Sequence, residues 1–191
     1  MKKLLITFSL IFAGCATNNS KQANGTEDSN QLWETYCKSN DCRKDVHFKL
    51  NFDDGPVDQI IPYYFPVIQN QKVISVLAGE KLYIEADLID NQLVNLKQVK
   101  SNSDPDRTIE ISFNQIEDSQ RMMLKVSNPF NKTLKFDIYM QALGDSESHY
   151  TSSCPAFANK SIIELWPYPI PELHILLREV LEGDKAEYTC D

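Results

Sequence analysis

The sequence predicts an all-β fold in which antiparallel strands form a two-layered sandwich. Three observations support this prediction. Apolar and polar residues alternate with period two through the middle of the chain, residues typical of turns separate the alternating stretches, and four cysteines follow residue 15. Period-two alternation suits a strand with one buried face, because successive side chains point to opposite faces of a sheet. An even number of cysteines favours disulfide bonds, which are common in small exported domains.

The first expected strand covers residues 46–52. Its even-numbered side chains are apolar and its odd-numbered side chains are polar, so one face is buried and His47 lies on the other. The strand ends at Asp53-Asp54-Gly55-Pro56, whose residue types favour a tight turn. The two aspartates could also bind calcium, but they lack the alternating acidic spacing of a calcium-binding loop. A solvated turn is the simpler interpretation.

Seven further stretches have the composition of strands. Short groups of Gly, Asn, Asp, Ser and Pro separate them. Strands at this spacing predict an immunoglobulin-like antiparallel β-sandwich of about seven to nine strands. The seven stretches are residues 72–78, 81–89, 93–99, 107–116, 121–128, 133–142 and 161–166.

The C-terminal stretch at residues 173–181 fits two structures. Leu173, Leu177 and Val180 share one stripe of a helix, yet Leu173, Ile175 and Leu177 also alternate as in a strand. We favour a strand because a sandwich has a sheet edge to fill, and a helix is the alternative. Three prolines between residues 166 and 172 favour extended backbone just before it.

The first fifteen residues have the pattern of an export signal. Two lysines near the start precede a mainly apolar stretch, and Ala13 and Gly14 stand before Cys15. The apolar stretch is too short to span a bilayer. The ending Phe12-Ala13-Gly14-Cys15 resembles the bacterial lipobox, at which the cysteine is acylated and becomes the new N-terminus. An ordinary signal peptide with a cysteine nearby is the alternative.

This interpretation predicts a lipoprotein signal peptide at residues 1–14, a lipidated Cys15 with a flexible tether to residue 31, and a single β-sandwich domain at residues 32–191. Residues 16–31 contain few apolar side chains and cannot bury enough surface to offset the entropy of ordering. Several acyl chains would hold Cys15 permanently at a membrane. Ala16, rather than Asp, follows the cysteine. In enteric-type bacteria this indicates sorting to the outer membrane of the cell envelope, facing the periplasm.

The charge balance narrows the choice of partners. The chain has 27 acidic and 19 basic residues, and no stretch is rich in Lys and Arg. An acidic surface repels phosphate groups, so a nucleic-acid partner is not expected. The expected partners are a membrane, reached through the lipid anchor, and another envelope protein.

Four cysteines remain after Cys15, namely Cys37, Cys42, Cys154 and Cys190. Three pairings are possible. We favour Cys37–Cys42 and Cys154–Cys190, because the first two are close in sequence and the other two flank the C-terminal segment. A redox or metal site is the alternative, but the spacing differs from the Cys-x-x-Cys of thiol oxidoreductases and zinc sites.

One part of the chain resembles a known group of proteins. Residues 122–136 contain an Asn-Pro-Phe-x-Lys-x-Leu hairpin, followed by Cys154-Pro155 and then by Trp166-Pro167-Tyr168-Pro169-Ile170. These elements resemble those of uncharacterised proteobacterial envelope lipoproteins and periplasmic proteins, over roughly residues 75–181. The resemblance implies a β fold and an envelope location, and it implies no functional site.

No catalytic or metal-binding motif is evident, so we expect a protein that is not an enzyme and that has no cofactor or metal. The three histidines form no pair at ligand spacing, and His149 falls in a polar loop at residues 145–153. Gly144-Asp145-Ser146 resembles the nucleophile block of one esterase class. It lies late in the chain, however, and lacks the Asp-x-x-His partner that such enzymes carry downstream.

Two aromatic and proline-rich patches are the best functional lead. One contains Tyr63, Tyr64 and Phe65, and the other contains Trp166 and Tyr168. Large rings on stiff backbone suit an interaction surface, although they could instead plug the open ends of the sandwich. We therefore expect a membrane-anchored, non-enzymatic interaction or structural module. The alternative is a periplasmic enzyme or binding protein for a small ligand or glycan, which predicts a concave pocket with converging polar groups.

Overall fold

The computed structural model describes residues 25–142, 147–181 and 190. The expected signal peptide, Cys15, the first part of the tether and the Gly144-Asp145-Ser146 block lie outside these residues. Within the described part of the chain, no helix is both long enough and apolar enough to cross a membrane.

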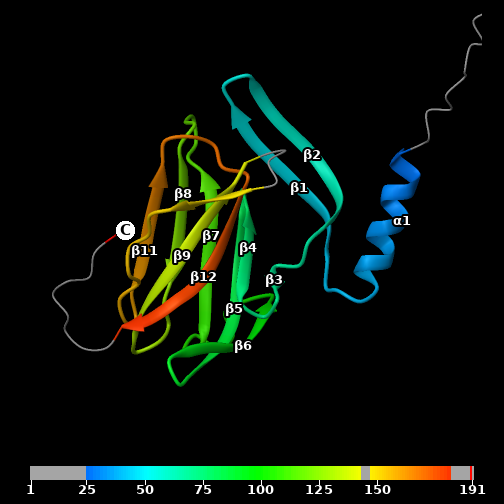
Figure 1. The fold of residues 1–191 in the computed structure, drawn as a ribbon. Coiled ribbons are helices and arrows are strands. Elements are labelled where there is room, and N and C mark those ends of the chain that lie inside the picture. The colour runs from blue at the N-terminus through cyan, green and yellow to red at the C-terminus, as the bar shows by residue number, and fades with distance from the viewer. Residues whose placement is uncertain (1–24, 143–146, 182–189, 191) are drawn as a thin grey trace, which may run out of the picture.

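Two five-stranded antiparallel sheets pack face to face as a sandwich, which confirms the predicted fold class (Figure 1). The first sheet has the order β10 (Ser148–Thr151), β9 (Thr133–Gln141), β12 (Glu172–Leu181), β4 (Val73–Leu77) and β3 (Ile68–Gln69). The second has the order β11 (Ser161–Trp166), β8 (Met122–Ser127), β7 (Thr108–Gln115), β5 (Glu80–Ile89) and β6 (Gln92–Val99).

The core lies between these two sheets. Its side chains come from alternate positions of the strands, as the period-two pattern predicts. On β5, for example, Leu82, Ile84 and Ala86 are buried while the residues between them are more exposed. Other fully buried side chains of the core are Ile109, Phe113, Leu124, Phe136 and Ile138.

The C-terminal stretch is the strand β12, as favoured, and a bulge explains its helix-like spacing. Leu173 and Ile175 are buried, and the pairing with β9 shifts register between Leu177 and Glu179. A bulge adds one residue to a strand and reverses the phase of its alternation. Leu177 and Val180 therefore both pack against the core, although they are three residues apart.

A separate hairpin packs on the sandwich. It consists of β1 (Arg43–Phe52) and β2 (Gly55–Tyr64), joined by the predicted turn. Phe48 and Leu50 of β1 point into the core and are buried. The side-chain amide of Gln115 accepts from the Asn51 N–H at 2.9 Å and donates to the Asn51 carbonyl at 2.8 Å.

The strand β2 was not predicted, because Pro56 and Pro62 interrupt its pattern. Its pairing with β1 explains why these prolines are tolerated. Asn51 lies opposite Pro56, and the backbone of Asn51 bonds to Gln115 instead of to β2. Alternation of the ladder then leaves Pro62 in an equivalent position at which no N–H is required.

A helix, α1 (Gly25–Cys37), precedes the hairpin and corrects the expected tether. The composition predicts a flexible segment up to residue 31, but residues 25–31 are helical. The physical reason lies at the helix's C-terminal half, where Trp33 and Tyr36 pack on Phe65 and Cys37 is held by a disulfide bond. The composition of residues 16–31 contains no sign of these contacts.

Both favoured disulfide bonds are present. The Cα atoms are 5.4 Å apart in Cys37–Cys42 and 4.1 Å apart in Cys154–Cys190. The expected polar loop at residues 145–153 is wrong in part, because β10 occupies residues 148–151 and pairs with β9. This short strand contains His149 and has no alternating pattern of its own.

Candidate functional site

The residues of the two predicted patches lie in different environments. Trp166 is a core side chain with an exposed fraction of 6%, which corrects its assignment to an interaction surface. Its ring is edge-on to Phe113, and its indole N–H donates to Thr151 Oγ1 at 2.8 Å. Tyr168, two residues further on, is exposed. The first patch is split between half-buried tyrosines and an exposed Phe65.

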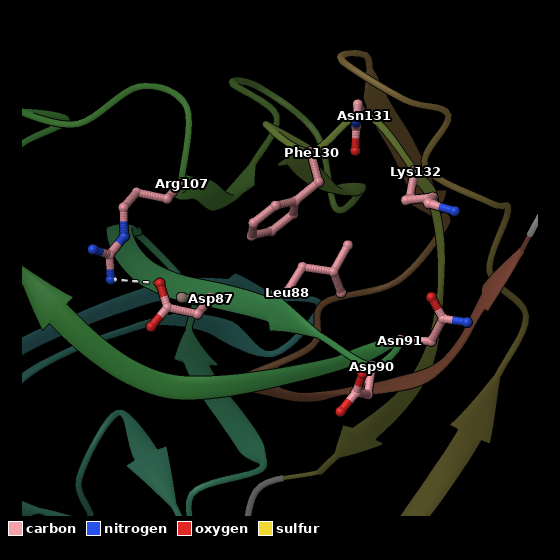
Figure 2. Close-up of a pocket in the computed structure, with 9 residues that line it drawn as sticks. Asp87, Leu88, Asp90, Asn91, Arg107, Phe130, Asn131 and Lys132 are labelled. Carbon is pink, nitrogen blue, oxygen red and sulfur yellow. Dashed lines mark ion pairs between the residues drawn. The ribbon is translucent and has the colours of Figure 1, made fainter.

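A polar cavity of about 470 Å³ lies beside the turn between β5 and β6 (Figure 2). Arg107 forms an ion pair with Asp87 at one side of it, with 3.1 Å between Nη2 and Oδ1. Leu88 and the largely buried ring of Phe130 provide apolar surface between the polar groups. The lining residues are Ala86, Asp87, Leu88, Asp90, Asn91, Arg107, Phe130, Asn131 and Lys132.

The edge strand β11 carries exposed apolar side chains. Ile163 and Leu165 lie on its outer face with exposed fractions of 57% and 49%. They are opposite Lys125 and Met123 of β8, while Ile162 on the inner face is buried. We call Ile163 and Leu165 the β11 face. Apolar residues on both sides of an edge strand are unusual for a surface that only contacts water.

Among the described residues, β11 pairs with β8 alone, so its other edge has no partner strand in this part of the chain. The Asn128 N–H donates to the Lys160 carbonyl at 2.8 Å, so the pair just before the strand is hydrogen-bonded to the β8 side. Bonded pairs alternate in an antiparallel ladder, so the backbone groups of Ile163 and Leu165 point away from β8. The apolar side chains of the β11 face therefore accompany backbone groups that can pair with another strand.

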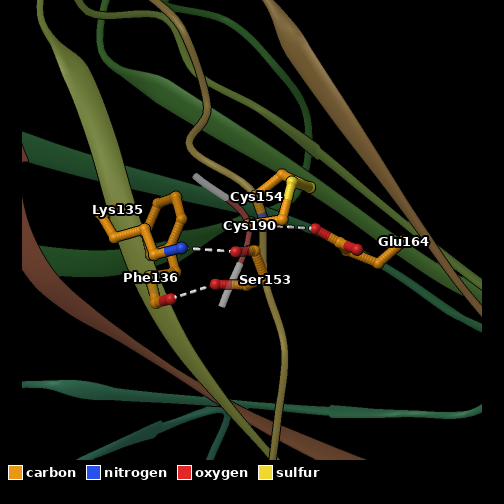
Figure 3. The surroundings of a disulfide bond; sticks show 6 residues. All are labelled: Lys135, Phe136, Ser153, Cys154, Glu164 and Cys190. Atoms are coloured by element: carbon orange, nitrogen blue, oxygen red, sulfur yellow. Dashed lines mark hydrogen bonds between the residues drawn. A yellow bond between two sulfur atoms is a disulfide. The ribbon is translucent and has the colours of Figure 1, made fainter. Parts of the chain in front are cut away.

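The Cys154–Cys190 disulfide bond holds the chain next to β11 (Figure 3). The Cys154 N–H donates to the carboxylate of Glu164 on β11 at 2.6 Å. Ser153 Oγ donates to the Phe136 carbonyl of β9 at 2.5 Å, and the buried Lys135 donates to the Ser153 carbonyl. Ser153 and Cys154 thus connect β9 of one sheet to β11 of the other, and these hydrogen bonds hold β11 in position.

A second apolar surface, the aromatic cluster, consists of Leu32, Trp33 and Tyr36 of α1 together with Phe65. The ring centroid of Phe65 is 4.8 Å from that of Trp33 and 5.9 Å from that of Tyr36, in edge-on geometry. Exposed fractions are 69% for Leu32 and 43% for Phe65. The four side chains line a shallow apolar cavity of about 240 Å³.

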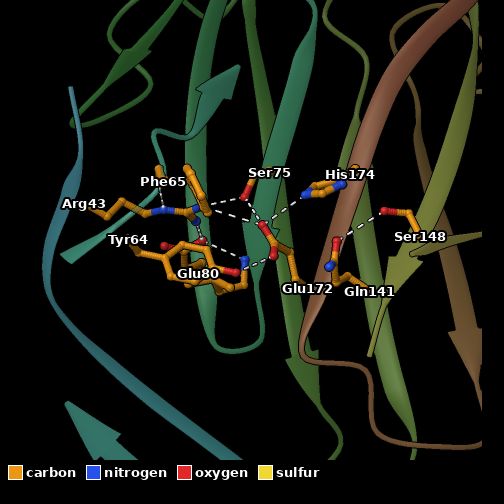
Figure 4. Close-up of polar contacts among 10 residues, drawn as sticks. Arg43, Tyr64, Phe65, Ser75, Glu80, Gln141, Ser148, Glu172 and His174 are labelled. Atoms are coloured by element: carbon orange, nitrogen blue, oxygen red, sulfur yellow. Dashed lines mark hydrogen bonds and ion pairs between the residues drawn. The ribbon is translucent and has the colours of Figure 1, made fainter. Parts of the chain in front are cut away.

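A network of charged groups lies beneath the aromatic cluster (Figure 4). Arg43, the first residue of β1, donates through Nε to the Phe65 carbonyl at 2.8 Å. Its Nη1 is 2.7 Å from Glu80 Oε2, and its Nη2 donates to Ser75 Oγ at 2.5 Å. The guanidinium also lies over the Tyr64 ring, 4.9 Å from its centroid. One cation therefore joins the hairpin, the segment after it and the sandwich.

The buried Glu172 is the second centre of this network. It accepts hydrogen bonds from Ser75 and from Tyr64 Oη, and His174 Nε2 lies 3.1 Å from its Oε1. Burial raises the pKa of Glu172, but the hydrogen bonds from His174, Ser75 and Tyr64 outweigh it and leave the pKa below its usual value. Glu172 is accordingly an ionised acceptor at neutral pH.

Glu80 and Tyr64, two neighbours of Glu172 in the network, have pKa values that are raised. Burial raises the pKa of Glu80 despite the attraction of Arg43. Burial and the hydrogen bond to Glu172 raise the pKa of Tyr64 far above its usual value, so its hydroxyl stays a donor. The network is thus a structural support for Phe65. Among the described residues, no group of three or more His, Cys, Asp or Glu side chains could hold a metal ion.

The two apolar surfaces were only partly predictable. Phe65 belonged to a predicted patch, but Leu32, Trp33 and Tyr36 did not, because they followed directly on the expected tether. Leu32, Trp33 and Tyr36 have the i, i+1, i+4 spacing of an apolar helix side, and this spacing was the signal in the sequence. The sequence predicts β11 as a strand but does not show which of its faces is buried. The strand, SIIELW, has apolar side chains on both faces.

Comparisons with protein families, with curated proteins and with solved structures find no match.

Proposed function

We propose that this chain is a membrane-anchored envelope lipoprotein that acts as a non-enzymatic interaction module. In this proposal Cys15 bears the lipid, and the β11 face binds a second envelope protein. The pattern of residues 1–15 and two disulfide bonds support an oxidising compartment outside the cytoplasm.

The edge of β11 that pairs with no other strand in the described ranges carries the proposal of a protein partner. Exposed edge strands pair readily with other chains, and proteins usually protect them with charges, prolines or cover. Here Ile163 and Leu165 add apolar surface along that edge. A partner strand that pairs with the backbone of β11 would also bury these two side chains.

The arrangement of the molecule suits a tethered module. Figure 1 shows α1 and β11 at opposite sides of the structure, with the hairpin and the sandwich between them. A lipid attached upstream of α1 leaves β11 at the far side, where a partner can reach it. The hydrogen bond from Cys154 to Glu164 fixes the position of that strand relative to the disulfide bond.

Site-specific photo-crosslinking in intact cells tests the partner. A photoreactive residue replaces Ile163 in the full acylated chain, and a matched control carries it at Lys97, an exposed position on the opposite edge strand β6. We expect a defined protein adduct from position 163 and none from position 97. Leu165→Glu should weaken the adduct at least about tenfold, because one lost apolar contact is worth more than 1.4 kcal/mol.

The anchor has its own test. Cys15→Ser should move the protein from the membrane fraction to the soluble fraction without changing its disulfide bonds. Equal adducts from positions 163 and 97 would contradict the interaction surface. An unacylated protein with free thiols in the cytosol would contradict the whole proposal.

The cavity of Figure 2 favours one alternative function, the binding of a small polyhydroxylated ligand such as a sugar. Carboxylate, amide and guanidinium groups can bond neighbouring hydroxyls, and Phe130 with Leu88 offers apolar surface to a ring. The test is an NMR titration of the full chain with neutral disaccharides. Shifts confined to Asn91, Arg107 and their neighbours would support this alternative, and an unchanged spectrum would exclude it for those sugars.

A further inference from the structure

We infer that the aromatic cluster is a membrane-contacting surface, and that its ligand is the headgroup region of a zwitterionic lipid bilayer. This inference rests on the acylation of Cys15 proposed above and gives the anchored protein a defined orientation.

The composition of the cluster suits this ligand. Leu32, Tyr36 and Phe65 are exposed, and Trp33 is half-buried against Phe65. Tryptophan and tyrosine combine an apolar ring with a polar group, so they prefer the boundary between hydrocarbon and water. A shallow apolar cavity among the four side chains leaves room for part of a lipid chain.

The helix α1 presents these side chains on one side. Successive residues of a helix are about 100° apart, so Leu32, Tyr36 and Trp33 span about 100° of its circumference. Glu34 lies about 100° beyond Trp33 by the same geometry, and it is exposed. Leu32, Trp33 and Tyr36 therefore share one side of the C-terminal half of α1, and Glu34 lies on another side of it.

The length of the chain keeps the cluster close to the bilayer. Helix α1 begins ten residues after Cys15, and ten residues span at most about 35 Å. Leu32 lies seven residues into the helix, which adds about 10 Å. The cluster therefore stays within about 45 Å of the lipid at all times. A weak intrinsic affinity for lipid is then sufficient, because attachment makes the contact intramolecular.

Charge selects the type of lipid. The sequence of α1, GTEDSNQLWETYC, contains three acidic residues and no Lys or Arg. Helices that bind anionic membranes rely on basic residues, which are absent from this helix. An acidic helix on an acidic protein is repelled by anionic lipid and accepts a zwitterionic surface.

The aromatic cluster is firmly connected to the rest of the molecule, so its contact with a membrane would orient the whole protein. Arg43 holds the Phe65 carbonyl, and Cys37–Cys42 fixes the end of α1. A docked cluster would therefore orient the hairpin and the sandwich as well. Because β11 lies on the opposite side of the molecule, docking would turn the β11 face away from the bilayer (Figure 1).

Tryptophan fluorescence provides the test, because the chain has two tryptophans in different environments. The full acylated protein is reconstituted in phosphatidylcholine vesicles whose acyl chains carry bromine, which quenches nearby indoles. The emission of Trp33 is the difference between the unsubstituted protein and Trp33→Phe. Trp166 is buried in the core and reports that the protein is folded. We expect loss of most of the Trp33 emission and an unchanged Trp166 emission.

Variants and a second lipid sharpen the test. Leu32→Ser and Phe65→Ser should reduce the quenching of Trp33, whereas Ile89→Ser, at another exposed apolar position, should not change it. Phosphatidylglycerol in place of phosphatidylcholine should give weaker quenching, and stronger quenching would overturn the choice of a zwitterionic surface.

Two failures are distinguishable. Protein that floats with the vesicles while Trp33 stays unquenched and accessible to iodide would overturn the inference and leave the proposed anchoring intact. Protein that does not float with the vesicles would overturn the anchoring, and the membrane-contacting surface with it.

Discussion

Arg43 and Glu80 form an ion pair with 2.7 Å between Nη1 and Oε2, and this pair ties the start of the hairpin to the start of β5. The exposed fraction of the Arg43 side chain is only 8%. Burial makes such a pair costly to break, because the remaining carboxylate has little water to replace its partner. Arg43 thus adds a buried ion pair to the core contacts of Phe48 and Leu50 that attach the hairpin.

Arg43→Met should destabilise the protein by about 3–5 kcal/mol, because it leaves Glu80 and Glu172 buried without their cation. Urea unfolding at neutral pH measures the change in the free energy of unfolding. Lys49→Met is the matched control, because Lys49 pairs with Asp58 at 3.8 Å with both side chains at least half exposed. The control should cost less than about 1 kcal/mol. Equal losses in the two variants would contradict a buried network.

The two carboxylates of the network predict opposite effects of pH. The pKa of Glu172 is lower in the folded protein than its ordinary 4.5, so its stabilisation is present above 4.5 and is lost as the pH falls through the folded value. The pKa of Glu80 is raised above 4.5, so its contribution is present below 4.5 and is lost as the pH rises through the folded value.

Glu172→Gln should therefore flatten the loss of stability in acid, and Glu80→Gln should make that loss steeper. Urea unfolding of both variants, from neutral pH to below 4.5, checks the two slopes. If both substitutions changed the pH dependence of stability in the same direction, the opposite pKa shifts of Glu172 and Glu80 would be contradicted.

Asn128 explains the Asn-Pro-Phe element in structural terms. Its buried side-chain amide donates to the carbonyls of Lys132 and Ala156 at 2.7 and 2.8 Å, and its Oδ1 accepts from the Phe130 N–H. Asn128→Ala should cost about 3 kcal/mol, because several buried backbone groups lose their partner. Asn131→Ala, at an exposed position of the same turn, should change stability by less than about 0.5 kcal/mol. Thermal unfolding of both variants measures the difference.

The two disulfide bonds should contribute different amounts to the free energy of unfolding. Replacing Cys154 and Cys190 by Ala should cost about 4 kcal/mol, because the bond closes a long loop in the unfolded chain. The residues that it joins are 36 positions apart, against 5 for Cys37 and Cys42. Removal of the shorter bridge should cost about 2 kcal/mol on the same chain-entropy account. Equal losses in urea unfolding would show that loop length is not the main factor.

The sequence alone predicts the sandwich well, because period-two alternation records which side chains face the core. It fails where that record is interrupted. The prolines of β2 hide a strand whose bonding partner is on one side only, and the bulge at residues 177–179 makes β12 resemble a helix.

The candidate site was less predictable than the fold. The sequence predicts Phe65, Tyr168 and Trp166 as parts of an interaction surface; the first two rings are exposed, whereas Trp166 fills the core. The aromatic cluster depends on contacts between α1 and a residue about thirty positions later, and composition does not record such contacts. The charge network joins Arg43 to Ser75, Glu80 and Glu172, a set that no local motif brings together.

The position of β12 has a consequence for the order of folding. This last strand lies in the middle of its sheet, between β9 and β4, and its partner residues in β4 come about a hundred positions earlier. Neither neighbour can complete its ladder until β12 itself has emerged. Contacts at such separation form slowly, since the intervening chain must first be closed into a loop. Until then the chain lacks the central strand of one layer.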